Sequence, residues 1–538
     1  MTMIQDIVAE GLARGWEAYD GSKLDRDVTI DCDVAIIGTG AGGGTAAEIL
    51  SRSGLRVVLL EEGPLMSSRD FHMLEREAYP NLYQESAARH TKDKGILILQ
   101  GRSVGGSTTV NWTSSFRTPP QTFAYWREHF GLAEYTPELL QPWFEMMERR
   151  LNVQPWAEPP NENNAVLQRG ALKLGIPTAV IPRNVKGCYN LGYCGMGCPT
   201  NAKQSMLVTT IPSALEHGAV LYSRVRAQRY LLEHDRVVAV ECAALDATGL
   251  RPGPHALTVR AKTFVSAGGA INNPALMLRS ALPNPYKLLG TRTFLHPTVI
   301  SSASMPEPVD AYSGAPQSIY SDHFLYTQPF GGAIGYKLEV PPMHPVLMST
   351  TLPGFGAVSA NLTAAMPNIQ VIIALMRDGF HAQSIGGIVE LKSDGTPLLD
   401  YPISQYLWEG ARRALVTMAE IQFAAGARTV LPLHESAEPY RNLTDAKAAI
   451  ATLPMDILRL RVASAHVMGG CAMGADERES IVDGHGRYHQ LQNLYAFDGS
   501  AFPTSLGVNP QLSIYAMVAR NASRLAHSLT GRAAAAIA

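Results

Sequence analysis

Two groups of residues, near opposite ends of the chain, have types and spacings that suit redox chemistry at a bound nucleotide. In the first group, the motif Gly38-Thr-Gly40-Ala-Gly-Gly43 follows an apolar run at 34–37, and Glu61 comes eighteen residues after Gly43. Gly38 allows a tight turn, Gly40 lets backbone amides approach a pyrophosphate, and Gly43 lets a helix pack closely on a sheet. Glu61 can accept hydrogen bonds from ribose hydroxyls. The pattern predicts a site for the ADP half of FAD or NAD and does not distinguish between them.

The second group lies near the C-terminus, where His466 stands in a glycine-rich segment ahead of Asp498-Gly499 and Asn509-Pro510. An imidazole titrates near neutral pH and can accept a proton, whereas an amide cannot act as a base but can hold and orient an oxygen. The alternatives are structural. A lone histidine in such a turn is more often structural than catalytic, Asp498 could be an ordinary turn residue, and Asn509 could cap the C-terminal helix.

Three of the six cysteines, Cys188, Cys194 and Cys198, lie close together in the sequence. Six cysteines are too few for a disulfide scaffold in a chain of this length. Thiolates at this spacing suit an iron–sulfur cluster, while a zinc site would need a fourth ligand. The three residues are therefore candidate iron–sulfur ligands.

The composition is that of a globular protein, with 46% hydrophobic residues, 17% charged residues and a formal net charge of −2. This balance predicts no nucleic-acid partner and no polybasic membrane contact. We find no secretory leader and no apolar run long enough to cross a bilayer, so we expect a cytoplasmic or peripherally membrane-associated protein. A length of 538 residues predicts two domains or one elaborated domain.

Periodicity and breakers predict the elements that position these residues. Apolar runs separated by Pro and Gly at 300–400 predict a sheet of a different kind from the parallel N-terminal one. The other expectations are helices at 5–20, 119–151, 273–280, 403–425 and 510–530, strands at 31–37, 57–60, 261–266 and 494–497, and burial of Trp126, Leu139, Leu140 and Met147 within 119–151.

The motifs stand in the order found in the glucose-methanol-choline oxidoreductases, and the chain resembles that family over most of its length. The resemblance is carried by the N-terminal fingerprint, the loop 101–111, the segment Val265-Ser-Ala-Gly268, Leu295-His296-Pro297 and the block 466–509. Its most specific part is Gly105-Gly106-Ser107 combined with a late His and Asn-Pro. The segment 194–205 is similar to the bacterial branch that includes long-chain alcohol oxidases and dehydrogenases.

Membership would imply an α/β fold with a Rossmann-like FAD-binding domain and a second, α+β substrate domain built on a mostly antiparallel sheet. The implied boundaries are an FAD-binding domain at 1–115, 187–300 (with the cysteine cluster) and 460–538, substrate-domain or lid helices at 116–186, and a substrate-binding domain at 301–459. FAD, rather than NAD, would be the resident cofactor.

The resemblance also implies roles for individual residues. His466 would take the hydroxyl proton of an alcohol while the flavin accepts the hydride, and Asn509 would orient the substrate oxygen. Val225 would contact adenine through its backbone, and Asp498-Gly499 would lie against the ribityl chain. His296 matches a motif position whose role is not defined. The implied FAD-binding set is Gly38, Gly40, Gly43, Glu61, Arg102, Gly105, Gly106, Ser107, Asn111, Val225, Ala267, Asp498, Gly499, Asn509 and Pro510.

Several alternatives stay open. The cysteine spacing resembles that of the flavin subunits of bacterial glucose and fructose dehydrogenases, which hold a [3Fe-4S] cluster. A cluster here would indicate a dehydrogenase that passes electrons to a partner protein or small subunit, and a periplasmic location would then require export with that partner. Hydroxynitrile lyases and fatty acid photodecarboxylases share the scaffold, but His466 argues against the second. Apolar residues expected to cover the pocket favour a hydrophobic alcohol as the small-molecule substrate; they are Phe324, Tyr326, Phe330 and Met348.

Overall fold

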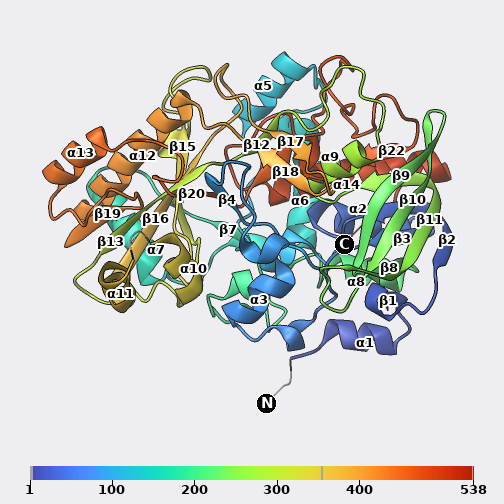
Figure 1. Cartoon of the computed structure of the whole chain (residues 1–538), viewed down its shortest axis with the longest axis horizontal. Helices are drawn as coiled ribbons and strands as arrows, with labels where there is room; N and C mark the ends of the chain where they lie inside the picture. Colours follow the sequence, from blue (N-terminus) through green and yellow to red (C-terminus); the bar gives the residue numbers. More distant parts are fainter. Residues whose placement is uncertain (1–3, 353–354, 536, 538) are drawn as a thin grey trace.

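The computed structural model describes residues 4–352, 355–535 and 537, and two eight-stranded sheets organise it (Figure 1). The first sheet has the order β1-β8-β3-β2-β11-β10-β9, with β22 beside β11. Adjacent strands in this sheet are parallel, except that β10 is antiparallel to both β9 and β11. The strands are β1 (Ala18–Asp20), β2 (Val28–Ile37), β3 (Val57–Leu60), β8 (Val220–Ser223), β9 (Val225–Glu233), β10 (Arg236–Leu245), β11 (Pro252–Ser266) and β22 (Leu494–Ala496).

The second sheet has the order β4-β20-β13-β16-β15-β14-β6, with β19 beside β13. All its neighbours are antiparallel except β4 and β20. The strands are β4 (Ile96–Ile98), β6 (Ala179–Val180), β13 (Thr298–Ser304), β14 (Ile319–Ser321), β15 (Tyr336–Glu339), β16 (Ile369–Met376), β19 (Thr429–Pro432) and β20 (Val462–Ser464). The predicted combination of a parallel, nucleotide-binding sheet and a mostly antiparallel second sheet is confirmed.

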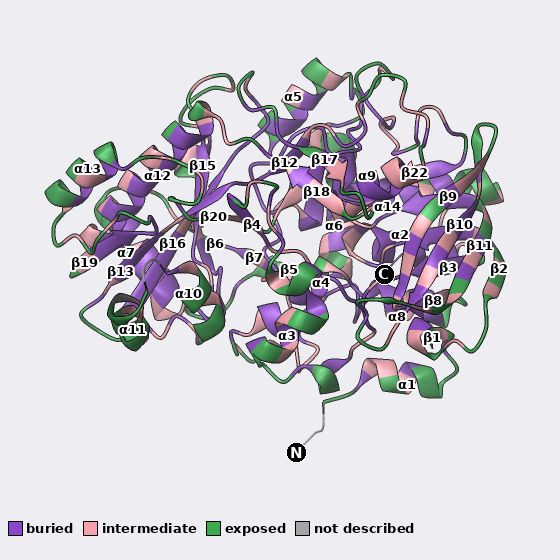
Figure 2. Cartoon of the chain, viewed as in Figure 1, coloured by how far each residue is buried: buried purple, intermediate pink, exposed green. Residues whose placement is uncertain are grey.

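Each sheet has its own hydrophobic core (Figure 2). In the first, α2 (Ala41–Arg52) packs against α14 (Gln511–Thr530), and the small residues of α2 let backbones approach closely. A Cβ added at Gly42 would lie 1.6 Å from the carbonyl oxygen of Phe497. In the second, α12 (Gln405–Ala424) packs on β16 and on α7 (Glu162–Lys173). Both cores therefore combine one sheet with long helices whose apolar faces cover it.

The remaining helices and strands complete the fold. The helices are α1 (Ile7–Ala13), α3 (Glu75–Leu82), α4 (Ser107–Val110), α5 (Pro120–Phe130), α6 (Pro137–Arg150), α8 (Thr210–Glu216), α9 (Asn272–Arg279), α10 (Pro345–Thr351), α11 (Ala357–Ala364) and α13 (Leu443–Thr452). Three two-stranded sheets are formed by β5 (Val153–Pro155) with β7 (Pro182–Asn184), β12 (Thr293–Leu295) with β21 (Val467–Gly469), and β17 (Ile388–Leu391) with β18 (Pro397–Asp400). Among the described helices, none has the length and apolar character needed to span a membrane.

Two predicted helices differ from the structure. The helix expected at 5–20 ends at Ala13, because Gly15 takes φ +102° and Trp16 turns back over Gly11, after which the chain enters β1. The helix expected at 119–151 divides into α5 and α6, because Gly131 ends α5 in the left-handed region at φ +64°. Glycines at left-handed positions therefore mark both breaks.

Burial within this region follows the prediction at three of four positions. Trp126, Leu140 and Met147 are fully buried in the first core. The prediction for Leu139 is wrong, since this residue is 56% exposed on the outer side of α6. α5 and α6 contribute to the first core and α7 to the second, while the domain boundaries drawn from the sequence stay predictions.

Candidate active site

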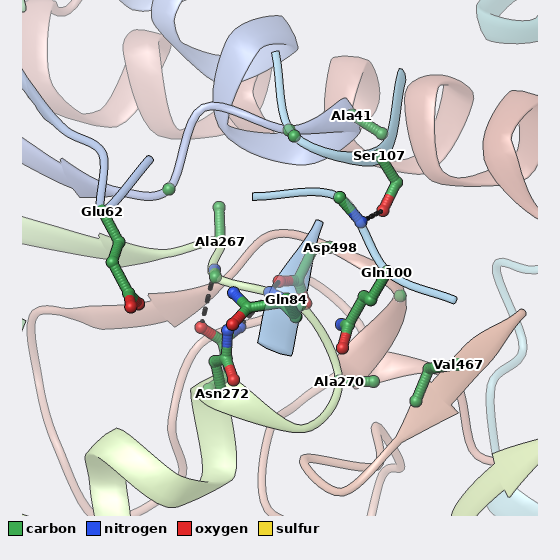
Figure 3. A pocket seen from close by; sticks show the side chains of 18 of the residues that line it. Ala41, Glu62, Gln84, Gln100, Ser107, Ala267, Ala270, Asn272, Val467 and Asp498 are labelled. Carbon is green, nitrogen blue, oxygen red and sulfur yellow. Dashed lines mark hydrogen bonds between the residues drawn. The ribbon is translucent and has the colours of Figure 1, made fainter. Parts of the chain in front are cut away.

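A cavity of about 420 Å³ opens where strands of the first sheet end, with Ile37, Leu60 and Ala267 among its lining residues. Ligands of open α/β sheets bind at the carboxyl ends of the strands. Glu62 stands at one end of the cavity, and Ala270 and Val467 stand near the other (Figure 3). The cavity therefore runs from the acidic residue that follows β3 toward the segment that contains His466.

Two glycine loops face each other across this cavity. Gly38 takes φ +99°, and Gly40 is the N-cap of α2 without any side-chain cap, so amide groups of the first helical turn remain available to an anion. From the second loop, Gly106 takes φ +53°, and a Cβ there would lie 2.7 Å from the Cα atom of Gly40. Only backbone fits between the two loops, and this arrangement suits a pyrophosphate.

Glu61 borders the cavity but also holds the glycine turn. Oε2 of Glu61 accepts hydrogen bonds from the backbone N–H (3.1 Å) and the hydroxyl (2.6 Å) of Thr39. Oε1 of Glu61 accepts from the N–H of Gly63 (2.8 Å). Burial raises the pKa of Glu61. The predicted ribose contact stays a proposal, and the carboxylate demonstrably fixes the loop that would bind the phosphates.

Arg102, predicted to bind the cofactor, is not among the residues that line the cavity and instead contacts Glu62, which does line it. Its Nε donates to Oε1 of Glu62 at 3.0 Å, and Arg226 donates to the same atom at 3.0 Å. Burial alone would raise the pKa of Glu62, but the charges of Arg226 and Arg102 outweigh this effect and lower the pKa below its usual range. Glu62, which sequence reasoning missed, thus lies at the edge of the cavity as a carboxylate.

Asp498, a predicted cofactor residue, ties two loops together. Its side chain accepts hydrogen bonds from the N–H of Gly269 (2.7 Å), Nδ2 of Asn273 (2.8 Å) and the N–H of Ser500 (2.8 Å). Burial raises the pKa of Asp498.

The predicted cofactor residues fall into two sets. The residues that line the cavity are Gly38, Gly40, Glu61, Gly106, Ser107, Asn111, Val225, Ala267, Asp498, Gly499, Asn509 and Pro510. Gly43, Arg102 and Gly105 lie behind this lining.

His466 borders the cavity just after β20. It is surrounded by protein and only partly accessible through the cavity, and this burial lowers its pKa to about 4, with Glu339 opposing the shift and Lys337 adding to it. The imidazole is therefore neutral at neutral pH. A neutral ring can exchange a proton with a substrate hydroxyl without a permanent charge in the cavity.

His296 fixes the proton of His466. The backbone N–H of Gly507 donates to Nε2 of His296 at 3.0 Å, and Nδ1 of His296 lies 3.0 Å from Nδ1 of His466. Burial lowers the pKa of His296 well below its usual value, so this ring is neutral. Because Nε2 of His296 accepts, its proton is on Nδ1 and is donated to His466, whose own proton is then on Nε2.

Asn509 lies between the cavity and a buried charged pair. Its Oδ1 accepts from Nζ of Lys337 at 2.9 Å, and its Nδ2 donates to Oε2 of Glu339 at 3.3 Å. Lys337 and Glu339 are themselves 2.8 Å apart and inaccessible. Sequence reasoning missed both, although two charges alternate with apolar residues along a short strand, and that pattern places them on one face.

The cysteines do not assemble a cluster site. Each thiol has its own neighbour, namely the N–H of Asn190 for Cys188, Nη2 of Arg183 for Cys194 and the hydroxyl of Thr200 for Cys198. Within residues 4–352, 355–535 and 537, no three His, Cys, Asp or Glu side chains are grouped so that they could hold a metal ion. These side chains do not fit a [3Fe-4S] cluster.

The apolar residues expected to cover the pocket lie elsewhere. Met348 is in the second core, Phe324 stacks on Tyr336, and Tyr326 and Phe330 surround the guanidinium of Arg377 at 5.2 and 4.3 Å. None of these four predicted residues lines the cavity; Tyr326 also packs against the first core, and Phe330 stacks on Phe380.

A glycine turn at the carboxyl ends of parallel strands that shares one cavity with a neutral histidine is the arrangement expected of a nucleotide-dependent oxidoreductase. Family models for the GMC oxidoreductases match residues 79–298 and 384–518. The chain belongs to the GMC oxidoreductase family, whose members bind FAD, and the predicted family is thereby confirmed.

Relatives and solved structures agree with this assignment. The chain is 28% identical to the GMC-type oxidoreductase y4nJ of Sinorhizobium fredii, over 95% of this chain and 98% of that protein. It is 28% identical to the long-chain-alcohol oxidase FAO1 of Arabidopsis thaliana, over 99% of this chain and 71% of that protein. The fold matches pyridoxine 4-oxidase from Mesorbium loti with a TM-score of 0.68 at 19% identity, covering 92% and 99% of the two chains.

Proposed function

We propose that this protein oxidises the CH–OH group of an alcohol to a carbonyl, with FAD as the hydride acceptor and with oxygen or another acceptor reoxidising the flavin. One observation carries the proposal: a single cavity connects the glycine cradle for a dinucleotide to His466 and Asn509. The alcohol loses one hydride and one proton, and FAD, when bound, supplies the acceptor for the hydride.

The residues at the inner end of the cavity would handle the hydroxyl group. Nε2–H of His466 donates to the hydroxyl oxygen in the tautomer that His296 selects, and Asn509 holds the same oxygen through its amide. His466 can take the hydroxyl proton at Nε2 only after both rings change tautomer, so that its own proton is on Nδ1 and faces an unprotonated Nδ1 of His296. Taking the hydroxyl proton then makes the ring an imidazolium, and because its pKa is about 4 this proton is passed on to solvent.

A hydrophobic primary alcohol is the substrate class we favour. Support comes from the plant relatives that are named long-chain-alcohol oxidases, at 27–28% identity. It does not come from the cavity wall, since the expected apolar residues pack elsewhere. Chain length is therefore the variable that an experiment must scan.

Anaerobic titration of the flavin-loaded protein tests the proposal. Primary alcohols of increasing chain length should bleach the oxidised flavin spectrum, with long chains effective at lower concentration than short ones. Glucose and pyridoxine serve as competing substrate classes. If no alcohol reduces the flavin while dithionite does, the proposed function is wrong.

A further inference from the structure

Two charged side chains lie side by side within the buried interior, beside the reactive end of the cavity. β15 has the sequence Tyr336-Lys337-Leu338-Glu339, and alternation along a strand places Lys337 and Glu339 on the same face. Both side chains are inaccessible, with exposures of 1% and 0%. Buried charges of this kind need partners.

Asn509 is the shared partner of the two charges. Nζ of Lys337 donates to Oδ1 of Asn509 (2.9 Å), and Oε2 of Glu339 accepts from Nδ2 (3.3 Å). An ammonium group can only donate and a carboxylate only accept, so the pair determines which end of the amide is oxygen and which is nitrogen. A flipped amide would oppose both charges.

Lys337 is itself held by aromatic rings. Its Nζ lies 3.2 Å from the ring centre of Phe116 and 4.7 Å from that of Tyr320. Burial lowers the pKa of Lys337, whereas the charge of Glu339 and these cation–π contacts stabilise its ammonium form. Because Nδ2 carries two hydrogens and Glu339 takes one, the second remains for a ligand in the cavity that Asn509 borders.

We propose that Lys337 and Glu339 are positioning residues that lock the amide of Asn509 with one N–H directed at the substrate oxygen. The inference deepens the proposed alcohol oxidation and rests on it for its kinetic part. Lys337 and Glu339 would not touch substrate or flavin; they would act through Asn509.

The test replaces both charges together. Removing one charge would leave the other buried without a partner, whereas replacing a buried pair by apolar residues of similar size is often tolerated. The double variant Lys337→Met, Glu339→Leu is therefore compared with the wild type. The matched control is Arg150→Met, Glu48→Leu, which removes another largely buried pair (2.9 Å) away from the cavity lining.

Kinetics of anaerobic flavin reduction give the first readout. The double variant should keep its flavin and reduce it about 10–100-fold more slowly at saturating alcohol, because the oxygen is no longer oriented. Combining it with Asn509→Ala should slow reduction no further than Asn509→Ala alone. The proposal would be overturned if the losses of rate multiplied in the combined variant, or if the control pair lost as much rate as the double variant.

A second readout needs no substrate. In protein labelled with ¹⁵N-asparagine, the side-chain signal of Asn509, identified by its loss in Asn509→Ala, should shift in the double variant and stay in place in the control. An unshifted signal would overturn the proposal. If alcohols fail to reduce the flavin, the proposed function falls, and this spectrum still decides whether the pair orients Asn509.

Discussion

The pairing of two neutral histidines decides what His466 can do. A backbone N–H from Gly507 fixes the proton of His296, and His296 in turn donates to His466. Sequence reasoning placed His466 at the reactive site but left His296 without a role. The histidine pair shows that the neighbour of a proton-handling residue selects its tautomer.

Replacing His466 by alanine should slow alcohol-dependent flavin reduction by about 10²–10⁴-fold, because the group that handles the hydroxyl proton is gone. The FAD content should be unchanged, since His466 is not part of the glycine loops that form the proposed phosphate site. Stopped-flow absorbance measures both quantities. His489→Ala is the control, because His489 bonds Ser480 (2.9 Å) outside the cavity lining. Equal losses in the two variants would contradict the assignment.

The pH dependence follows from the lowered pKa of His466, about 4 compared with an ordinary value of 6.5. The neutral ring should give a constant flavin-reduction rate between about pH 5 and 8, with a fall only as the pH approaches 4. A fall centred near pH 6.5 would contradict the buried, neutral assignment.

The lowered pKa of His466 also makes the free energy of unfolding depend on pH. As the pH falls below 6.5, the unfolded chain binds a proton at this position and the folded chain does not until about pH 4. The free energy of unfolding should therefore decrease across this window and not recover below it. His296, whose pKa is lowered in the same direction, adds to the effect.

At the scale of elements, the site depends on two loops that meet through backbone alone. Gly106→Ala places a Cβ 2.7 Å from the Cα atom of Gly40, at a φ of +53°. The variant should purify with little FAD, as measured by absorbance after denaturation. Gly54→Ala is the matched control, because Gly54 also has positive φ (+84°) but nothing within 4 Å of an added Cβ. Full FAD content in Gly106→Ala would contradict the proposed cradle.

Local motifs were predictable and long-range partners were not. The strand, turn and helix around Gly38 follow from residues that are adjacent in sequence. Lys337, Glu339 and Asn509 come together only because β15 of the second sheet lies against the segment that precedes α14, 170 residues or more away in sequence. The prediction that Phe324 and Met348 cover the pocket was wrong because apolar character does not say which core a side chain joins, and the predicted burial of Leu139 was wrong because it does not say which face of a helix is covered.

At the scale of the whole molecule, both sheets contribute to one cavity. Its lining includes Ala267 after β11 of the first sheet and His466 after β20 of the second. A cofactor bound there contacts both parts and should stabilise them together.

Protein stripped of flavin should therefore unfold at a lower temperature, and FAD should raise its Tm in a concentration-dependent way. At a hundredfold excess over Kd, the gain in free energy of unfolding is about 2.7 kcal/mol. Differential scanning fluorimetry measures the shift, with NAD as the control ligand. A shift with NAD equal to that with FAD would contradict the choice of cofactor.

The most direct test of the central claim is the rate of anaerobic flavin reduction by a long-chain primary alcohol and by the same alcohol deuterated at C1. The proposed hydride transfer predicts complete bleaching of the flavin by both, with the deuterated alcohol distinctly slower. An unchanged flavin spectrum with either alcohol would contradict the account.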